Sequence, residues 1–203
     1  MAPSRDRQGA VISIGGPPHS GKSVFAHALN KALASKMGDE VFLERCNPDG
    51  EGNWAYESPP ELVQAIRVKN PFSDDFVRAK LAGIAGLRQS KRVVLLDLGG
   101  KIAPDIHQFL SASTHALLVS GDDGALEKWK AAVASANGCQ LLGALRSTLV
   151  RTTDGTLDAA ARSTVCLIGP AWTGGLVNLD REGPNEPYSA AVSAIAEHIA
   201  VIA

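Results

Sequence analysis

The sequence has few cysteines, and their spacing excludes a zinc site. Its 203 residues include only Cys46, Cys139 and Cys166, which lie far apart. Zinc sites in proteins use cysteine and histidine ligands at short, regular spacings, and no such spacing occurs here. Each cysteine lies in or beside an apolar run. We therefore expect reduced, partly buried thiols that bind no metal.

Long apolar runs and an excess of one charge are also missing. No segment reaches the roughly 18 apolar residues that span a bilayer. The first nine residues, MAPSRDRQG, are polar and do not form a secretory signal. The net charge is −1, so the surface as a whole does not favour nucleic acid or an anionic membrane. These absences predict a cytoplasmic protein that has no membrane partner.

Apolar runs alternate with segments of helical periodicity, which indicates a single α/β domain. Hydrophobic residues make up 45% of the chain, enough for one core over residues 10–203, after a flexible N-terminus at residues 1–9. Apolar runs predict strands at residues 10–15, 40–46, 92–100, 115–121, 140–146 and 164–170. Helical spacing predicts helices at residues 22–37, 60–68, 73–89, 104–112, 124–137 and 189–203. Ser73 is the expected N-cap of the third helix.

The predicted strands are apolar throughout, which is typical of strands buried on both faces. With the intervening helices, they predict a parallel sheet of five to six strands with helices on both faces. The carboxyl ends of parallel strands meet at one edge of such a sheet, and ligands bind there. The loops expected at this edge follow Ile14, Cys46, Asp97, Ser120, Arg146 and Ile168.

The stretch GGPPHSGKS, residues 15–23, contains a complete phosphate-loop motif, G-x-x-x-x-G-K-[ST]. It lies between a predicted strand and a predicted helix, as this motif requires. Backbone N–H groups at a helix N-terminus bind phosphate, and glycines let the chain approach it closely. The predicted nucleotide contacts are Gly16, His19, Ser20, Gly21, Lys22, Ser23 and Val24. The expected fold is therefore that of a P-loop NTPase.

Two residues of this loop have specific expected roles. Lys22 reaches the β- and γ-phosphates, where it acts in catalysis, and the hydroxyl of Ser23 binds Mg²⁺. His19 has two interpretations, a contact to phosphate or substrate, or a residue at the top of the loop without chemical function. A plain turn between strand and helix would explain neither Lys22 nor Ser23.

Asp97 is the expected acidic partner of the magnesium ion. It ends the apolar run VVLLD, where such proteins hold Mg²⁺ with an acidic residue; the alternative is a residue of a turn or cap. Leu98 follows, so the Asp-Glu pair of fast hydrolytic motors is absent. Asp97-Leu98-Gly99-Gly100 also fits the D-x-x-G of GTPase switches, but no N-K-x-D that would recognise guanine occurs. ATP and Mg²⁺ are the expected cofactors.

The loop CNPDGEGNW at residues 46–54 should lie at the same edge of the sheet. Asp49 and Glu51 are the catalytic candidates for a base that accepts the proton of an attacking hydroxyl. Trp54 is a candidate for stacking on a base or ring. The alternative is a glycine-rich turn with solvated carboxylates and a tryptophan that packs on the core.

Phosphoryl transfer also needs positive charge near the transferring group. Arg146, at the end of a predicted strand, is the catalytic candidate; Arg151, Arg162 and Lys101 are further ones. Each of them alone is also interpretable as an ordinary surface charge. The segment GPAWTGG, residues 169–175, is expected to form a further loop at the edge of the sheet, near the adenine.

Four segments in this order, GGPPHSGKS, CNPDGEGNW, VVLLDLGGK and THALLVSGD, give the chain a resemblance to a known group. It is similar to the P-loop ATPase domain, labelled AAA and kinase-like, that is fused to CRISPR-associated ring nucleases. The resemblance implies antiviral defence of type III CRISPR, with cyclic oligoadenylate or RNA as a partner. The chain has no room for the ring-nuclease domain, so either a separately encoded ring nuclease is a partner or the ATPase works alone.

These observations leave two main functions open. The first is kinase-like transfer of the γ-phosphate from ATP·Mg to a hydroxyl on a nucleotide, an RNA end or a small molecule. The second is a nucleotide-switched regulatory ATPase, which changes its partner or oligomeric state; a homo-oligomer is expected. A third, which rests on the resemblance alone, is a sensor in which cyclic oligoadenylate controls the use of ATP.

Overall fold

The computed structural model describes residues 8–47 and 73–203, which form a seven-stranded sheet with helices on both faces. Its strands are β1 (Ala10–Gly15), β2 (Val41–Cys46), β3 (Val93–Leu98), β4 (His115–Ser120), β5 (Gln140–Thr148), β6 (Thr164–Ile168) and β7 (Ala171–Val177). Their order across the sheet is β2-β3-β1-β4-β5-β7-β6. All neighbouring strands are parallel except β6, which pairs with β7 in the antiparallel direction.

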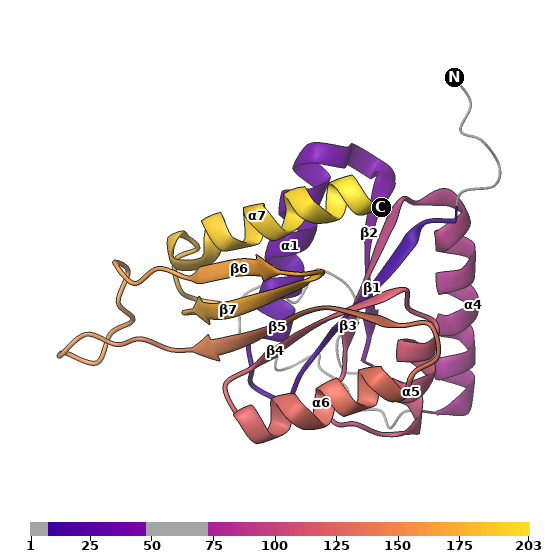
Figure 1. Cartoon of the computed structure of the whole chain (residues 1–203), viewed down its shortest axis with the longest axis horizontal. Coiled ribbons are helices and arrows are strands. Elements are labelled where there is room, and N and C mark those ends of the chain that lie inside the picture. The colour runs from indigo at the N-terminus through magenta and orange to yellow at the C-terminus, as the bar shows by residue number, and fades with distance from the viewer. Residues whose placement is uncertain (1–7, 48–72) are drawn as a thin grey trace.

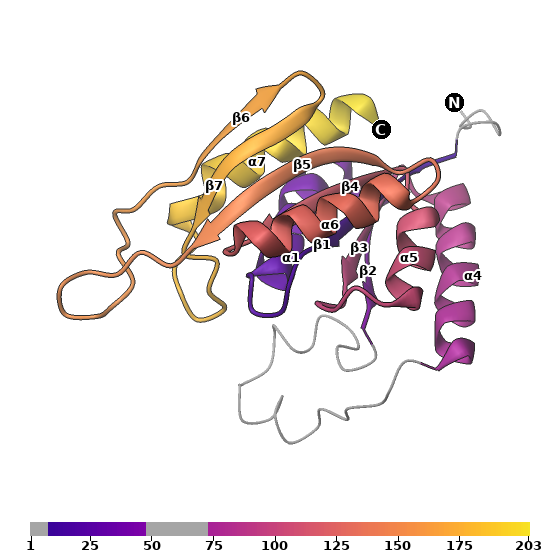
Figure 2. The ribbon, with the colours of Figure 1, turned by 60° about the horizontal axis from the view of Figure 1, so that its bottom comes forward.

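The helices lie in two layers (Figure 1 and Figure 2). They are α1 (Lys22–Met37), α4 (Asp74–Ser90), α5 (Pro104–Ser111), α6 (Asp123–Ser135) and α7 (Glu186–Ile202), with a short 3₁₀ turn, η1 (Gly38–Glu40), after α1. Helices α1 and α7 cover one face of the sheet, and α4, α5 and α6 cover the other. The predicted N-cap of α4 is confirmed, because Ser73 Oγ accepts a hydrogen bond from Phe76 N–H at 3.1 Å.

The central strands are buried on both sides because alternate residues face different helix layers. On β1, Ile12 and Ile14 pack with α1 and α7, whereas Val11 packs with α4, α5 and α6. On β3, Leu95 faces the first layer and Leu96 the second. This two-sided burial explains why the central strands read as continuous apolar runs, and it confirms the predicted parallel α/β sheet.

The outer part of the sheet differs from the prediction in two ways. The expected loop at residues 169–175 is largely a strand, β7, which follows β6 after a two-residue turn at Gly169 and Pro170. Since β6 runs antiparallel, the end of this strand at Ile168 lies away from the edge where the other strands end. That edge instead receives the segment after β7, which begins at Asn178.

The three cysteines are free, and one of them was predicted wrongly. Cys46 is buried and Cys139 is half-buried, but Cys166, on the outermost strand, is exposed rather than partly buried. The apolar run around Cys166 suggested a covered strand, whereas this strand lies at the border of the sheet. Among the described residues, no helix has the length and apolar character needed to span a bilayer. The predicted helix at 60–68 lies outside the described residues.

Candidate functional site

The phosphate loop joins β1 to α1 at the edge where the parallel strands end, and two of its positions accept only glycine. Gly16 has φ +146°, and a Cβ there would lie 1.9 Å from the carbonyl oxygen of Val119. Gly21 has φ +80°, and a Cβ there would lie 2.6 Å from Cβ of Leu179. The loop therefore packs directly on the end of β4 and on the segment that follows β7, with no room for larger side chains.

Between these glycines, His19 has an unusual backbone conformation and Ser20 has a buried hydroxyl. His19 has φ +60°, a left-handed conformation that is uncommon outside glycine, and its side chain is exposed. The hydroxyl of Ser20 is buried, and no hydrogen-bond partner for it occurs among the described residues. A strained backbone and a buried polar atom without a partner are features that a bound ligand would account for.

The N-terminus of α1 is open to an anion. Gly21 is the N-cap and offers no side-chain cap, and no acidic residue occurs in the first turn. The first helical hydrogen bond runs from Phe25 N–H to the carbonyl oxygen of Gly21, at 2.9 Å. The N–H groups of Lys22, Ser23 and Val24 precede it and have no partner within the helix, so they and the helix dipole favour negative charge at this point.

Lys22 carries a buried positive charge into the same place. Its side chain bends back over the loop, and Nζ donates a hydrogen bond to the carbonyl oxygen of Pro17 at 2.8 Å. Burial lowers the pKa of Lys22 below its usual value, and the negative charge of nearby Asp97 partly offsets this effect. Because an ammonium group carries three N–H donors, Nζ can donate two hydrogen bonds beyond the one to Pro17.

Asp97 lies beside the loop because β3 and β1 are neighbours. Asp97 pairs in register with Ile14 of β1, and only 6% of its surface is exposed. Ser23, one residue into α1, is half-buried. A carboxylate and a hydroxyl oxygen suit Mg²⁺, which protein sites bind through one or two such groups together with substrate phosphates. The described residues contain no cluster of three or more acidic, histidine or cysteine side chains that would hold a metal alone.

The segment that follows Asp97 touches the phosphate loop. A Cβ at Gly100 would lie 2.6 Å from the backbone nitrogen of Pro18. This close approach requires glycine at that position. The sequence suggested a switch motif for Asp97-Leu98-Gly99-Gly100, and the structure adds a direct contact between this segment and the loop.

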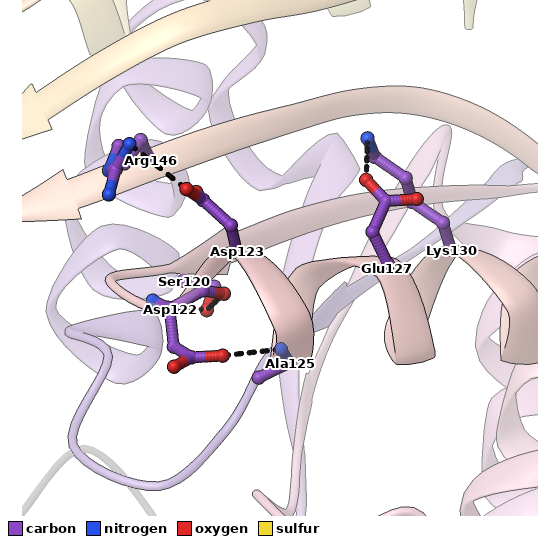
Figure 3. A network of polar contacts seen from close by, with 7 residues as sticks. All are labelled: Ser120, Asp122, Asp123, Ala125, Glu127, Lys130 and Arg146. Atoms are coloured by element: carbon purple, nitrogen blue, oxygen red, sulfur yellow. Dashed lines mark hydrogen bonds and ion pairs between the residues drawn. The ribbon is translucent and has the colours of Figure 1, made fainter.

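The predicted cations lie at different places on the surface. Arg146, at the end of β5, is exposed and forms an ion pair with Asp123 at the start of α6, at 3.2 Å (Figure 3). Lys101 is also exposed. Arg151 donates a hydrogen bond to the carbonyl oxygen of Gly155, so it supports its own loop.

Arg162 is likewise exposed, and it donates to the carbonyl oxygens of Ala159 and Ala161. Arg146 is thus the predicted cation at a parallel strand end, where an ion pair orients it. Asp49, Glu51 and Trp54 lie outside the described residues, so their predicted roles stay predictions.

Sequence reasoning missed a groove beside the phosphate loop. It has a volume of about 370 Å³ and lies between α1, α7 and the segment after β7. Its lining includes Val24, Ala28, Lys31, Asp180 and Tyr188. The signal that could have indicated it is the helical spacing of residues 24, 28 and 31, which places a mixed polar and apolar stripe next to Ser23.

Comparisons with known proteins agree with this geometry at the level of the fold. No family model and no curated protein matches the chain. The cell division ATPase MinD from Pyrococcus furiosus is similar in structure, with a TM-score of 0.59 and 15% identity over 96% of this chain and 100% of that one. The septum site-determining protein MinD from Pyrococcus horikoshii, complexed with Mg-ADP, has a TM-score of 0.57 and 16% identity over 94% and 95%.

A plasmid partition protein from Borrelia burgdorferi has a TM-score of 0.58 and 11% identity, over 97% of this chain and 100% of that one. The chain has the fold of these P-loop proteins. At such low identities the likeness concerns the fold alone. The resemblance to AAA-labelled domains of CRISPR-associated ring nucleases rests on the quoted motifs only, because neither the family models nor the curated proteins support it.

Proposed function

We propose that the chain binds ATP with Mg²⁺ and hydrolyses it as a nucleotide-switched ATPase. The observation that carries the proposal is the meeting of three features at one place. These are the open N-terminus of α1, the buried ammonium of Lys22 and the buried carboxylate of Asp97. One similar solved structure is named as an ATPase and another is complexed with Mg-ADP, which supports the same cofactors for this chain.

The phosphate chain of ATP would provide hydrogen-bond acceptors for two donors of the loop, Lys22 and Ser20. Lys22 would exchange its contact to Pro17 for phosphate oxygens, whose negative charge compensates a buried ammonium better than a neutral carbonyl does. The hydroxyl of Ser20 would gain an acceptor in the same step. Both changes strengthen as charge develops on the β- and γ-phosphates, so they favour the transition state as well as binding.

Magnesium fits the oxygen atoms that Ser23 and Asp97 offer, and when bound it would neutralise charge on the phosphates. Asp97 is preorganised for this role because β3 is buried along its whole length and pairs with β1. The carboxylate therefore needs no rearrangement of the backbone to serve the site.

The groove between α1 and α7 is the proposed place of the nucleoside. It begins at Val24, which follows Ser23, so phosphates at the loop and a base in the groove form one continuous ligand. Its volume of about 370 Å³ suits part of a nucleotide. Val24, Ala28 and Tyr188 would provide apolar surface, and Asp180 an acceptor for an exocyclic amino group.

Hydrolysis coupled to a switch is preferred to phosphoryl transfer because of one contact. The segment after Asp97 touches the phosphate loop through Gly100 and Pro18. Loss of the γ-phosphate from the loop would therefore alter this contact and, with it, the conformation of the segment after Asp97, as in other nucleotide switches. Kinase-like transfer, the first function that the sequence predicts, depends on Asp49 and Glu51 and is the second candidate here.

The test is to incubate the protein with Mg²⁺ and γ-labelled ATP, alone and with nucleosides, 5′-hydroxyl RNA or cyclic oligoadenylate. We expect the label to appear as free phosphate in every tube. Label on an acceptor would replace the proposal with a kinase. Consumption of no ATP under any condition would contradict both functions.

A matched pair of variants assigns the turnover to this site. Lys22→Ala should abolish it, whereas Lys36→Ala, at the exposed end of the same helix, should leave it unchanged. Circular dichroism of both variants establishes that the fold is retained. A change in turnover when RNA or cyclic oligoadenylate is added would support the partners that the resemblance implies, and a constant rate would oppose them.

A further inference from the structure

The outer strand β6 forms an unusual edge of the sheet. It is the last strand in the order, and its five residues, TVCLI, contain no charge and no proline. Val165 packs partly on the core below, but Leu167 and Ile168 are 41% and 65% exposed. Figure 2 shows β6 at the border of the sheet, next to β7. Among the described residues it thus presents an apolar, open edge.

The opposite edge of the same sheet is built differently. Strand β2, with the sequence VFLERC, carries Glu44 and Arg45, and Glu44 forms an ion pair with Lys80 of α4 at 2.6 Å. Proteins protect sheet edges from unwanted pairing with charges, prolines or a covering element. Strand β2 has the protection of charge, and β6 has neither charge nor proline. An unprotected edge of this kind favours pairing with another strand.

The turn after β6 defines which of its backbone groups face outward. Gly169 has φ +58° and precedes Pro170, as in a two-residue hairpin turn that begins with glycine. In such a hairpin the flanking residues, Ile168 and Ala171, form a hydrogen-bonded pair.

Hydrogen-bonded pairs alternate along an antiparallel ladder. Cys166, opposite Thr173, is therefore hydrogen-bonded to β7. Val165 and Leu167 alternate with it, so they direct their N–H and C=O groups away from β7.

We propose that β6 pairs with β6 of a second copy of this chain, in the antiparallel direction about a two-fold axis at Cys166. The outward N–H and C=O groups of Val165 then face those of Leu167 of the second copy. By symmetry, Leu167 faces Val165 of the second copy in the same way. Both pairs are hydrogen-bonded pairs with correct geometry. Cys166 lies opposite Cys166 of the second copy as a non-hydrogen-bonded pair.

The absence of charge favours an identical partner over a different one. Charged residues that face each other across two strands are destabilising when their signs are equal. A strand without charge avoids this penalty when it pairs with itself, and it offers nothing for the charges of another protein to recognise. The resulting dimer joins two seven-stranded sheets into one.

This interface is separate from the candidate nucleotide site. Four strand spacings lie between β1 and β6, which is about 19 Å at the usual distance between neighbouring strands. The dimer is therefore expected with and without nucleotide. The inference does not depend on the proposed function, and it assigns the expected homo-oligomer to a specific surface.

The natural cysteine provides the test. Cα atoms of a non-hydrogen-bonded pair lie about 4.5 Å apart, within the range that a disulfide spans. The protein is treated with diamide, which takes up the two electrons and two protons released when two thiols form one disulfide. We expect a covalent dimer on a non-reducing gel, with equal yield in the presence of ATP and Mg²⁺.

Variants establish the origin of the crosslink. Cys166→Ser should abolish it, and Cys139→Ser should keep it. Leu167→Pro removes an outward N–H without removing a hydrogen bond to β7, so it should lower the yield at least tenfold in a folded protein. Leu167→Ala, which keeps this N–H, should crosslink as the natural chain does.

If Leu167→Pro does not fold, Leu167→Lys takes its place, because a charge at this edge should prevent pairing in the same way. Sedimentation of Cys166→Ser at rising concentration should show a reversible dimer. The proposal is overturned by a monomer at all concentrations. It is also overturned if the Cys166 crosslink forms with the same yield in a folded Leu167→Pro or Leu167→Lys variant. Such a crosslink would arise from random collisions rather than from strand pairing.

Discussion

The two halves of the sheet are built by different rules. The strands β1, β3 and β4 are buried almost along their whole length, between two helix layers. Across the sheet, β6 has four exposed residues and one half-buried residue. The half around β1 holds the candidate site among buried strands, and the half around β6 is open to solvent. A buried strand such as β3 suits the proposed role of Asp97, because a group that binds the nucleotide or its Mg²⁺ must keep its position without reorganisation.

The largest expected difference between the halves concerns their cations. Lys22→Ala should lower ATP turnover at least 100-fold, because it removes a preorganised charge at the phosphates. Arg146→Ala should lower it only about tenfold, because the guanidinium is exposed and already paired with Asp123. Initial rates of phosphate release measure both. Equal losses would show that Arg146, on β5, serves the nucleotide site as directly as Lys22 does.

Truncation of one leucine to alanine in each half tests how tightly the two halves are packed. Leu95→Ala, at a fully buried position of β3, should lower the free energy of unfolding by about 3 kcal/mol. Leu167→Ala, on β6, should change it by less than about 0.5 kcal/mol, because the side chain lies at the open edge of the sheet and is 41% exposed. Denaturation by urea gives both values. A large loss for Leu167→Ala under dilute conditions would show that β6 is covered.

Two glycines at which an added Cβ would meet no other atom should give a smaller difference in stability. Gly155, in the loop after β5, has φ +85°, and a Cβ there would meet no atom within 4 Å. Gly155→Ala should therefore destabilise by about 1 kcal/mol through backbone strain alone. Gly86→Ala, in the open interior of α4, should stabilise by a similar amount or less. Thermal unfolding compares them, and the same sign for both would contradict the assigned conformations.

The smallest expected effect is a pH dependence of the protein's stability, which arises in the loop after β5. Hydrogen bonds from Thr152 and Thr156 lower the pKa of Asp154 to about 2, from 3.8. A carboxyl with a lowered folded pKa stabilises the fold above its unfolded pKa, and this contribution is lost as the pH falls through about 2. The stability difference between the natural chain and Asp154→Asn should therefore shrink from pH 5 to pH 2.5. A titration of Asp154 near pH 4 by NMR would contradict the hydrogen bonds.

The sequence predicted the half of the sheet around β1 well, because ligand chemistry and two-sided burial both restrict residue types there. Phosphate binding requires glycines, a lysine and a hydroxyl in a fixed order, so the motif at Gly16 to Ser23 identifies the loop directly. The alternation of Ile12 and Val11 between two helix layers gives the apolar run that indicates a buried parallel strand.

The half around β6 was harder to predict for physical reasons. An apolar strand has the same composition in either direction, so nothing in residues 164–168 indicates that β6 is antiparallel. Strand β7 contains Gly174 and Gly175, which are typical of loops, and Gly174 is required because a Cβ there would lie 2.2 Å from the carbonyl oxygen of Thr164. The contact of Leu179 with Gly21 is tertiary, and no local pattern reports it.

Calorimetric titration of the protein with ATP in the presence of Mg²⁺ is the decisive experiment on the nucleotide site at Lys22 and Asp97. We expect one bound ATP per chain, loss of binding in Lys22→Ala, and natural affinity in Lys36→Ala. We also expect Asp97→Asn to weaken the effect of Mg²⁺ on binding. An unchanged affinity in Lys22→Ala, or no binding to the natural chain, would contradict a nucleotide site at this place.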